Sequence, residues 1–266
     1  MQFPHIDPVF LRLGTVELRW YGLMYIIGFV AAYFVIYAEA KRQKIPLNRD
    51  YVADLIFAAA FGVILGGRLG YVLFYNLSEY VAHPLKIFAV WEGGMSFHGG
   101  LAGAILGGVW FAHKKKIGFL TIADLGFLTA PIGLGLGRIG NFINGELYGR
   151  VTDVPWGMVF PDPQAGNLPR HPSQLYEAFL EGPVIFFVLW NMGRKERPAG
   201  IIFWTFITIY GLFRFLVEFF REPDFQLGFI IRSFTMGQLL SFPMVFLGTI
   251  MIWRSYDRER RKREQR

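Results

Sequence analysis

Apolar residues run along this chain in long stretches, separated by short polar segments that carry most of the charge. A helix needs roughly 20 consecutive apolar residues to cross a bilayer. Stretches of this kind lie at about 20–39, 51–75, 95–112, 120–143, 176–192, 200–220 and 235–253. The pattern predicts an all-α polytopic membrane protein with about seven transmembrane helices.

The positions of Lys and Arg predict the orientation of these helices. Seventeen of the 27 Lys and Arg residues follow the first, third, fifth and seventh spans, in "KRQKIPLNR", "HKKK", "RKER" and the tail "RSYDRERRKREQR". Seven lie on the opposite side, namely Arg12, Arg19, Lys86, Arg150, Arg170, Arg221 and Arg232. Because short cytoplasmic loops are enriched in Lys and Arg, we expect the N-terminus outside and the C-terminus in the cytoplasm. Only an odd number of spans puts all four basic segments on one side.

The composition agrees with a membrane protein and excludes several other classes. Hydrophobic residues make up 53% of the chain and charged residues 18%, with a mean hydropathy of +0.36. The net charge of +7 does not indicate nucleic-acid binding, since the basic residues sit between apolar runs instead of clustering on one face. The chain contains no Cys, which excludes disulfides, thiolate metal sites and a cysteine nucleophile of its own.

The organisation along the chain predicts one integral-membrane domain over residues 1–266. The N-terminus lacks a basic region followed by a short apolar run, so we expect no cleaved signal peptide and a first span that remains in place. Residues of about 144–175 are rich in Pro, Gly and aromatics, which predicts a small irregular cap on the outer side. The basic tail of about 254–266 is expected to lie against anionic lipid at the inner face.

Gly135, Gly137 and Gly140 match the letter pattern of a dinucleotide-binding loop. That loop needs a strand before its glycines and a helix after them, but here a long apolar segment surrounds them. Small residues also allow transmembrane helices to pack closely. Closely spaced glycines within apolar segments also occur at Gly62, Gly66, Gly67, Gly70, Gly99, Gly100, Gly103 and Gly107. We therefore interpret these glycines as packing positions.

Three arginines, Arg68, Arg138 and Arg214, lie within predicted spans, roughly 9–12 Å below the outer helix ends at about 1.5 Å per residue. Charged side chains at membrane depth usually face the bundle interior or a wet cavity. Alternatively, each arginine snorkels outward or pairs structurally, as Arg214 could with Glu218 one turn later. Three arginines at one depth favour an anion site, and a lipid phosphate suits guanidinium groups well.

Two further polar residues fall in the same outer half: Tyr21 opens the first span and His98 follows the outer start of the third. If phosphate is a leaving group, the arginines would stabilise its developing charge, and a neutral histidine could take a proton from the incoming nucleophile. These residue types indicate a transferase that acts on a phospholipid.

Two other functions are compatible with parts of the sequence. A lipid or anion transporter would place its site near the midplane and expose it alternately to both sides, which is further inward than the predicted site. An intramembrane serine hydrolase could use His171, Ser173 and Glu177 of "RHPSQLYE", provided that the three side chains lie within hydrogen-bond reach. Alternatively, Ser173 caps the helix that follows it.

Several ordered motifs resemble one known family. "GRIGNFINGELYGR" at 137–150 is similar to the signature of the prolipoprotein diacylglyceryl transferases, with Arg138, Asn141, Phe142, Asn144, Glu146 and Gly149 at its characteristic positions. Further resemblance is carried by "WYGLMY" at 20–25, "GGRLGYVLFYN" at 66–76, "GGMSFHGG" at 93–100, "RHPSQLYE" at 170–177 and "YGLFRFLVEFFREPD" at 210–224. The motifs cover nearly the whole chain, apart from a short segment at about 151–169.

The resemblance implies transfer of an sn-1,2-diacylglyceryl group from phosphatidylglycerol to the lipobox cysteine of a preprolipoprotein. This step forms a thioether and releases glycerol 1-phosphate, and it begins bacterial lipoprotein maturation. Phosphatidylglycerol, the lipobox segment and membrane lipids are the implied partners, and no metal, nucleotide or other cofactor is expected. The family works in the bacterial inner membrane, with its site toward the periplasm.

The resemblance also implies roles for individual residues. Arg138 and Arg214 would hold or activate the lipid phosphate, and Arg68 would support them electrostatically. His98 is the candidate base for the thiol, with a structural hydrogen-bonding role as the alternative. The remaining matched positions would shape the lipid headgroup site or orient the arginines: Tyr21, Asn141, Glu146 and Tyr210.

Overall fold

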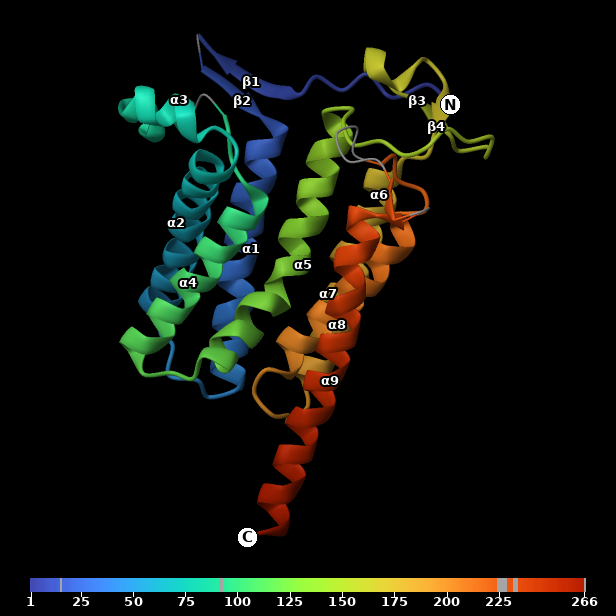
Figure 1. Cartoon of the computed structure of the whole chain (residues 1–266). Coiled ribbons are helices and arrows are strands. Elements are labelled where there is room, and N and C mark those ends of the chain that lie inside the picture. The colour runs from blue at the N-terminus through green and yellow to red at the C-terminus, as the bar shows by residue number, and fades with distance from the viewer. Residues whose placement is uncertain (15, 91–92, 224–228, 232–233, 266) are drawn as a thin grey trace. The chain divides into compact units, whose positions relative to one another are not determined.

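A computed structural model describes residues 1–14, 16–90, 93–223, 229–231 and 234–265 of the chain (Figure 1). The long helical segments are α1 (Trp20–Arg42), α2 (Arg49–Phe74), α4 (Phe97–Lys115), α5 (Phe119–Ile143), the run α6–η4–α7 (Ser173–Phe179, Leu180–Val184, Ile185–Gly193), α8 (Ile201–Val217) and α9 (Met236–Glu264). Arg232 and Arg266, which were counted among the outer and inner charges, and Asp224 of the last motif lie outside the described residues.

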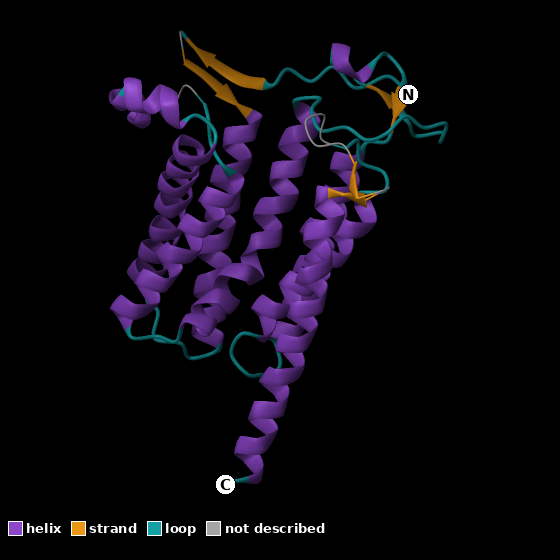
Figure 2. Cartoon of the chain, in the orientation of Figure 1, coloured by secondary structure: helices purple, strands orange, loops and turns teal. Residues whose placement is uncertain are grey.

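In the described part of the chain, a helix occupies each of the seven predicted spans, as the purple ribbons of Figure 2 show. Five are long and apolar enough to cross a membrane, namely 20–42, 49–74, 119–143, 173–193 and 236–264, and 201–217 is a shorter apolar helix. Their surfaces carry large apolar side chains such as Phe34, Phe57 and Phe242, which are 63%, 71% and 71% exposed. Exposed apolar area of this extent is typical of lipid contact. The chain is therefore a mostly helical polytopic membrane protein.

The chain divides into two compact units. One contains residues 33–123, and the other contains residues 1–32 and 124–266. Each unit is described by itself below.

In the unit of residues 33–123, α2 and α4 pack against each other through glycines. The glycines recur every four residues on both helices, at Gly62, Gly66 and Gly70 of α2 and at Gly99, Gly103 and Gly107 of α4. A Cβ built on Gly70 would lie 2.9 Å from the Cα of Gly99, which is closer than Cβ contacts normally come. The interpretation of these glycines as packing positions is therefore confirmed for this helix pair.

Side-chain caps define where two of these helices begin. The Asn48 side chain accepts a hydrogen bond from Tyr51 N at 2.8 Å, and Ser96 Oγ accepts one from Gly99 N at 3.2 Å. Each cap satisfies a donor that the first helical turn leaves without an intrahelical acceptor. The C-cap of α4 is Lys116, which adopts a left-handed conformation with φ 54°.

The segment between α2 and α4 is folded, which the sequence analysis did not anticipate. It contains the short helix α3 (Leu77–Ala82) and the 3₁₀ helix η1 (Pro84–Phe88). An ion pair of 2.7 Å between Lys86 and Glu79 links the two. Hydrogen bonding to Lys86 lowers the pKa of the Glu79 carboxyl below its ordinary value.

The larger unit carries the cap that follows α5. Strands β3 (Met158–Val159) and β4 (Pro169–Arg170) form an antiparallel pair, with the 3₁₀ helix η3 (Pro163–Ala165) between them. Its small core contains Phe3, Phe160 and Ala165, with Phe142, Tyr148 and Met158 packed against it. The chain's first residues join this cap, since Phe3 N donates to Val159 O at 3.2 Å and Val159 N donates to Met1 O at 2.9 Å.

Two further strand pairs lie outside the spans, as the orange arrows of Figure 2 show. The hairpin of β1 (Val9–Leu13) and β2 (Val16–Arg19) leads directly into α1. β5 (Phe229–Ile231) and β6 (Phe234–Thr235) precede α9. α9 itself continues through the basic tail, so the tail is helical as far as Glu264.

Candidate active site

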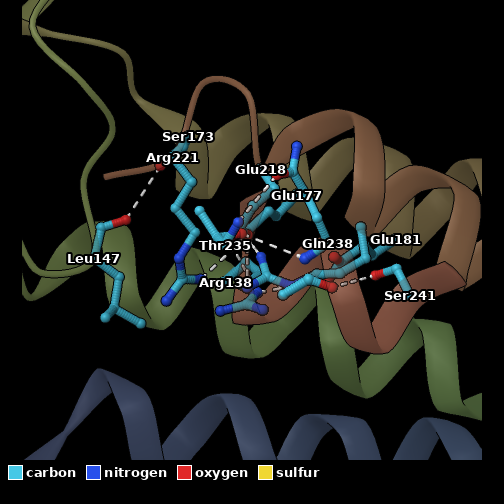
Figure 3. A network of polar contacts seen from close by, with 12 residues as sticks. Arg138, Leu147, Ser173, Glu177, Glu181, Glu218, Arg221, Thr235, Gln238 and Ser241 are labelled. Atoms are coloured by element: carbon cyan, nitrogen blue, oxygen red, sulfur yellow. Dashed lines mark hydrogen bonds and ion pairs between the residues drawn. The ribbon is translucent and has the colours of Figure 1, made fainter. Parts of the chain in front are cut away.

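Glu177 lies at the centre of a buried cluster of charged side chains (Figure 3). It is on α6 and is completely buried. Its Oε1 accepts hydrogen bonds from Arg214 Nη1 at 2.6 Å and from Arg221 Nη1 at 3.2 Å. Its Oε2 lies 3.0 Å from Arg138 Nε. One carboxylate therefore brings together Arg138 of α5 and Arg214 of α8, two of the three arginines that were expected inside the membrane.

Glu181 lies one turn further along and also faces Arg138. Its side chain is completely buried, and its Oε2 is 3.5 Å from Arg138 Nε. It belongs to the π-helical turn η4, in which Gly182 has non-helical torsion angles. Turns of this kind are frequent at functional sites. The turn approaches α5 closely, because a Cβ built on Gly135 would lie 3.0 Å from the Cα of Gly182.

Glu218 connects the cluster to α9. Its Oε2 lies 2.9 Å from Arg214 Nη2, so the pairing along α8 that was considered from the sequence is present. Its Oε1 accepts a hydrogen bond from the Thr235 hydroxyl at 2.9 Å. Thr235 caps α9 in a reciprocal capping box with Gln238. Arg214 is therefore held between Glu177 on one nitrogen and Glu218 on the other.

The cluster combines three arginines with three glutamates, so its formal charge is zero. Burial of an ion costs several kcal/mol, and removal of one partner from a buried pair typically costs about 3–5 kcal/mol. Arg138 approaches both carboxylates most closely through Nε, and within the described part of the chain its Nη1 and Nη2 donate no hydrogen bond to Glu177 or Glu181. Its side chain is 17% exposed. Its terminal nitrogens are therefore available to an anion, and a guanidinium binds phosphate oxygens in pairs.

The polar residues of the 137–150 motif fold against one another where α5 ends. Asn141 Nδ2 donates to Glu146 Oε1 at 2.8 Å, and Asn144 Nδ2 donates to the same oxygen at 3.1 Å. Gln174 Nε2 donates to the backbone carbonyl of Glu146 at 2.6 Å. Gln174 is on α6, three residues before Glu177. Helix α6 therefore contacts the motif through Gln174 and the arginines through Glu177.

Gly149, near the end of the motif, lies between two backbone segments. It forms an antiparallel bridge with Arg221, and its N–H donates to His171 O at 2.8 Å. A Cβ built on Gly149 would lie 2.8 Å from both the Cβ and the carbonyl oxygen of His171. Only glycine fits this position without a shift of the backbone.

Tyr21 and Tyr210 are in the same unit as the cluster. The Tyr21 ring covers Gly140, where a built Cβ would lie 2.7 Å from Tyr21 Cδ2, and its hydroxyl lies 3.3 Å from that of Tyr25. Tyr210 stacks on Phe206 with ring centroids 5.5 Å apart. It is close enough to Arg138 for an electrostatic interaction.

Arg68 is in the other unit and is 3% exposed. Its nitrogens donate to four backbone carbonyls, those of Lys86, Ile87, Gly93 and Gly94. Its guanidinium carbon lies 5.1 Å from the centre of the Tyr80 ring. These contacts hold the segment after α2 in place. The guanidinium of Arg68 is therefore bound by backbone carbonyls of its own unit.

His98 is in the unit of residues 33–123, in the first turn of α4. Its side chain is exposed, and its ring lies edge-on to Phe97 with centroids 5.6 Å apart. The exposed position of the imidazole makes it accessible, which is compatible with the role suggested by the motif at 93–100.

The three residues considered for a serine hydrolase have different partners. Ser173 Oγ donates to Leu147 O at 3.2 Å, and His171 Nδ1 lies 3.1 Å from the Tyr176 hydroxyl. Glu177 binds the arginines. Ser173, His171 and Glu177 therefore do not form a contacting set of nucleophile, base and orienting residue. Ser173 does not cap α6 either, since the residue at the cap position is Pro172 and makes no side-chain cap bond.

Burial lowers the pKa of His171 below its ordinary value, since it disfavours the charged imidazole. The residue lies outside the spans, in the cap. Among the described residues, no three His, Asp or Glu side chains are grouped so that they could hold a metal ion.

Sequence reasoning missed Glu177 and Glu181 as partners of the arginines. Both lie inside the predicted span of 176–192, so the rule that drew attention to intramembrane arginines applies equally to them. Their spacing of four residues places them on one helical face. Two buried carboxylates on one face of an apolar span are therefore a sequence signal for partners of the intramembrane arginines.

Comparison with known proteins identifies the family. The model of the family described as prolipoprotein diacylglyceryl transferase matches residues 8–254. The chain belongs to this family. A protein of Geobacter sulfurreducens named phosphatidylglycerol–prolipoprotein diacylglyceryl transferase is 70% identical over 251 residues, which cover 94% of this chain and 96% of the relative. A protein of the same name from Aeromonas hydrophila is 54% identical over 256 residues, covering 96% of this chain and 93% of the relative.

The family assignment confirms the resemblance that the motifs suggested. Because the match extends over 8–254, it includes the arginine–glutamate cluster, the 137–150 motif and the helix that carries His98. The chain is therefore a transferase, and the relatives it resembles are bacterial. The apolar helices of the chain agree with a membrane location.

Proposed function

We propose that this chain transfers the sn-1,2-diacylglyceryl group of phosphatidylglycerol to the lipobox cysteine of a preprolipoprotein, the first step of lipoprotein maturation. A carbon–sulfur bond forms at the glyceryl carbon as its carbon–oxygen bond to phosphate breaks. The products are a thioether and glycerol 1-phosphate, and the thiol proton passes to a base. The names of the relatives support both substrates.

The observation that carries the proposal is the pairing of Arg138 and Arg214 on one buried carboxylate. In this arrangement Arg138 presents its terminal nitrogens to an anion. As the glyceryl carbon–oxygen bond breaks, negative charge grows on the phosphate, and donors that are already in place stabilise this charge without reorganisation. We assign Arg138 and Arg214 to that role.

The other residues of the site have supporting roles in this proposal. His98 takes the proton from the thiol, an assignment that rests on its motif and its exposure. Asn141 and Glu146 shape the headgroup site through the hydrogen bond between them. Tyr21 and Tyr210 shape the headgroup site or orient the arginines, and Arg68 supports the site electrostatically while its hydrogen bonds anchor the backbone around it.

The proposed setting is the bacterial inner membrane. The distribution of Lys and Arg supports seven spans, with the N-terminus in the periplasm, the C-terminus in the cytoplasm and the site toward the periplasm. In this arrangement the chain is one integral-membrane domain, residues of about 144–175 form a periplasmic cap, and the basic tail of about 254–266 lies at the cytoplasmic face. The reaction uses neither a metal nor a nucleotide.

Mass spectrometry of a lipobox peptide tests the function. The peptide is incubated with the purified full-length chain and phosphatidylglycerol, beside a matched peptide with Cys→Ser. We expect a diacylglyceryl adduct on the thiol peptide only, together with released glycerol phosphate. Absence of the adduct, with a folded protein that still binds phosphatidylglycerol, would contradict the transferase and favour a lipid transporter or sensor.

The base is tested by His98→Gln in the same assay. General base catalysis typically contributes about 10²–10⁴-fold to a rate. We therefore expect kcat to fall by at least about 100-fold, with a small change in KM for phosphatidylglycerol. A variant with an unchanged kcat and an unchanged pH profile would rule out His98 as the base.

A further inference from the structure

We propose that Glu177 is a positioning residue, which sets the spacing and the orientation of the two guanidinium groups that bind the lipid phosphate. The inference rests on the proposed function and goes further by assigning a role to a residue that the sequence analysis considered only as part of a hydrolase triad. Glu177 itself does not contact the substrate in this proposal. It acts through Arg138 and Arg214.

The geometry of the carboxylate supports this role. Its two oxygens serve different arginines, since Oε2 lies 3.0 Å from Arg138 Nε and Oε1 accepts from Arg214 Nη1 at 2.6 Å. The two guanidinium groups come from different helices, α5 and α8. Because both are attached to one rigid planar group, their separation is determined by Glu177.

The way in which Arg138 is bound also matters. Glu177 approaches Arg138 most closely at Nε, at the base of the guanidinium, and within the described residues the terminal nitrogens donate no hydrogen bond to Glu177 or Glu181. A counter-ion that only neutralised charge would be expected to pair with those terminal nitrogens, as carboxylates commonly do with the arginine fork. The contact at Nε neutralises Arg138 without a hydrogen bond from its terminal nitrogens to these carboxylates, so the fork can donate to a phosphate.

Glu177 is held firmly enough to act in this way. It is completely buried, and one turn earlier on the same helix the buried Gln174 donates to the backbone carbonyl of Glu146 at 2.6 Å. The carboxylate is also bound by Arg221, whose Nη1 donates to Glu177 Oε1 at 3.2 Å. Both the helix and the carboxylate are therefore attached to neighbouring segments.

Two substitutions separate positioning from charge compensation. Glu177→Gln keeps the shape, but its amide has only one oxygen. If that oxygen stays with Arg214 and Arg221, the amide nitrogen faces Arg138 Nε, and two donors cannot bind each other. Glu177→Asp keeps the charge but is one methylene shorter, so its carboxylate cannot keep both contacts without movement of the helices.

The experiment measures kcat and KM for phosphatidylglycerol with the full-length chain in mixed micelles. A misplacement of about 1 Å can cost about 100-fold in rate. We expect kcat to fall about 10- to 100-fold in both variants, with a smaller change in KM. Glu39→Gln is the matched control, since Glu39 is also buried in an apolar helix beside an arginine, Arg42, but lies in the other unit. It should change kcat by less than about threefold.

A double-mutant cycle tests whether Glu177 acts through Arg138. In an Arg138→Ala background, Glu177→Gln should add less than about a threefold loss, because the spacing that Glu177 sets requires both guanidinium groups and one of them is absent. Full additivity would overturn the proposal. So would a Glu177→Asp variant with the kcat of the unmodified chain, since this would show that the negative charge alone suffices.

Two further measurements keep the outcomes distinct. If Glu177→Gln does not fold, as judged by thermal unfolding, the Glu177→Asp variant decides between positioning and charge compensation. Failure of the unmodified chain to form the thioether would contradict the proposed function. A normal adduct yield with the unmodified chain and unaffected kcat values in both variants would contradict only the role of Glu177.

Discussion

Gly135 of α5 meets Gly182 of the π-helical turn η4 so closely that a Cβ on Gly135 would lie 3.0 Å from the Cα of Gly182. Arg138 follows Gly135 by three residues, and Glu181 immediately precedes Gly182. The glycine contact therefore lies one turn from the ion pair between Arg138 and Glu181. Close approach of the two backbones allows the arginine to reach the buried carboxylates.

This relationship predicts the effect of added volume at Gly135. Gly135→Ala should push α5 away from η4, and overpacking of this kind costs about 1–3 kcal/mol. We expect a lower melting temperature and a lower kcat, because Arg138 moves with its helix. Gly133→Ala is the control, since a Cβ at Gly133 meets no atom within 4 Å among the described residues. Equal effects of the two substitutions on kcat would contradict the packing argument.

The helices and their packing glycines could be predicted from the sequence because both depend on local patterns. Apolar length located all seven helical segments, and repeated glycines indicated the contact between α2 and α4. Two of the three glycines in the letter pattern around Gly135 also pack closely, Gly135 against Gly182 and Gly140 against Tyr21, whereas a Cβ at Gly137 meets no described atom within 4 Å. A long apolar segment in a bilayer can adopt few conformations, because its backbone N–H and C=O groups must form their hydrogen bonds within the segment.

The partners of the charged side chains could be predicted much less well. The sequence marked Arg138 and Arg214, but their shared attachment to Glu177 depends on how α5, α6 and α8 pack. The widened turn at Gly182 and the addition of Phe3 to the cap core are likewise products of long-range contacts. Residues distant in sequence compete for each arginine, and periodicity contains no information on which of them will be adjacent.

The contacts of Arg68 lead to a second prediction. Its four hydrogen bonds to carbonyls make it a structural anchor, so Arg68→Lys should lower the free energy of unfolding by about 2–4 kcal/mol. Lysine has one nitrogen and cannot reach all the carbonyls. Thermal unfolding in detergent measures the effect, with Arg12→Lys as the control because the Arg12 side chain is 58% exposed. A rise in KM for phosphatidylglycerol without any loss of stability would instead indicate that Arg68 binds lipid.

Ser173 provides a test of the hydrolase alternative. Its hydroxyl donates one hydrogen bond to Leu147 O at 3.2 Å, and a single hydrogen bond contributes about 1 kcal/mol net. Ser173→Ala should therefore cause a small loss of stability and change the transfer rate by less than about twofold. Complete loss of activity in a variant with a near-normal melting temperature would restore Ser173 as a candidate nucleophile.

The lowered pKa of His171 leads to a prediction of how the stability of the protein depends on pH. Burial lowers the pKa of the folded imidazole below its value of 6.5 in an unfolded chain, although Asp153 acts in the opposite direction. Between the two values the unfolded state binds more protons, so the contribution to stability is complete above about pH 6.5 and is lost as the pH falls through the folded pKa. The melting temperature should therefore decrease from about pH 7.5 to about pH 5.5.

The variant His171→Gln separates this contribution from those of the carboxylates. Glutamine does not titrate, and its amide can still form a hydrogen bond with the Tyr176 hydroxyl, which lies 3.1 Å from His171 Nδ1. The variant should lose less stability on acidification than the unmodified chain does, because one protonation linked to unfolding has been removed. Parallel curves of melting temperature against pH for the two proteins would show that His171 titrates equally in both states.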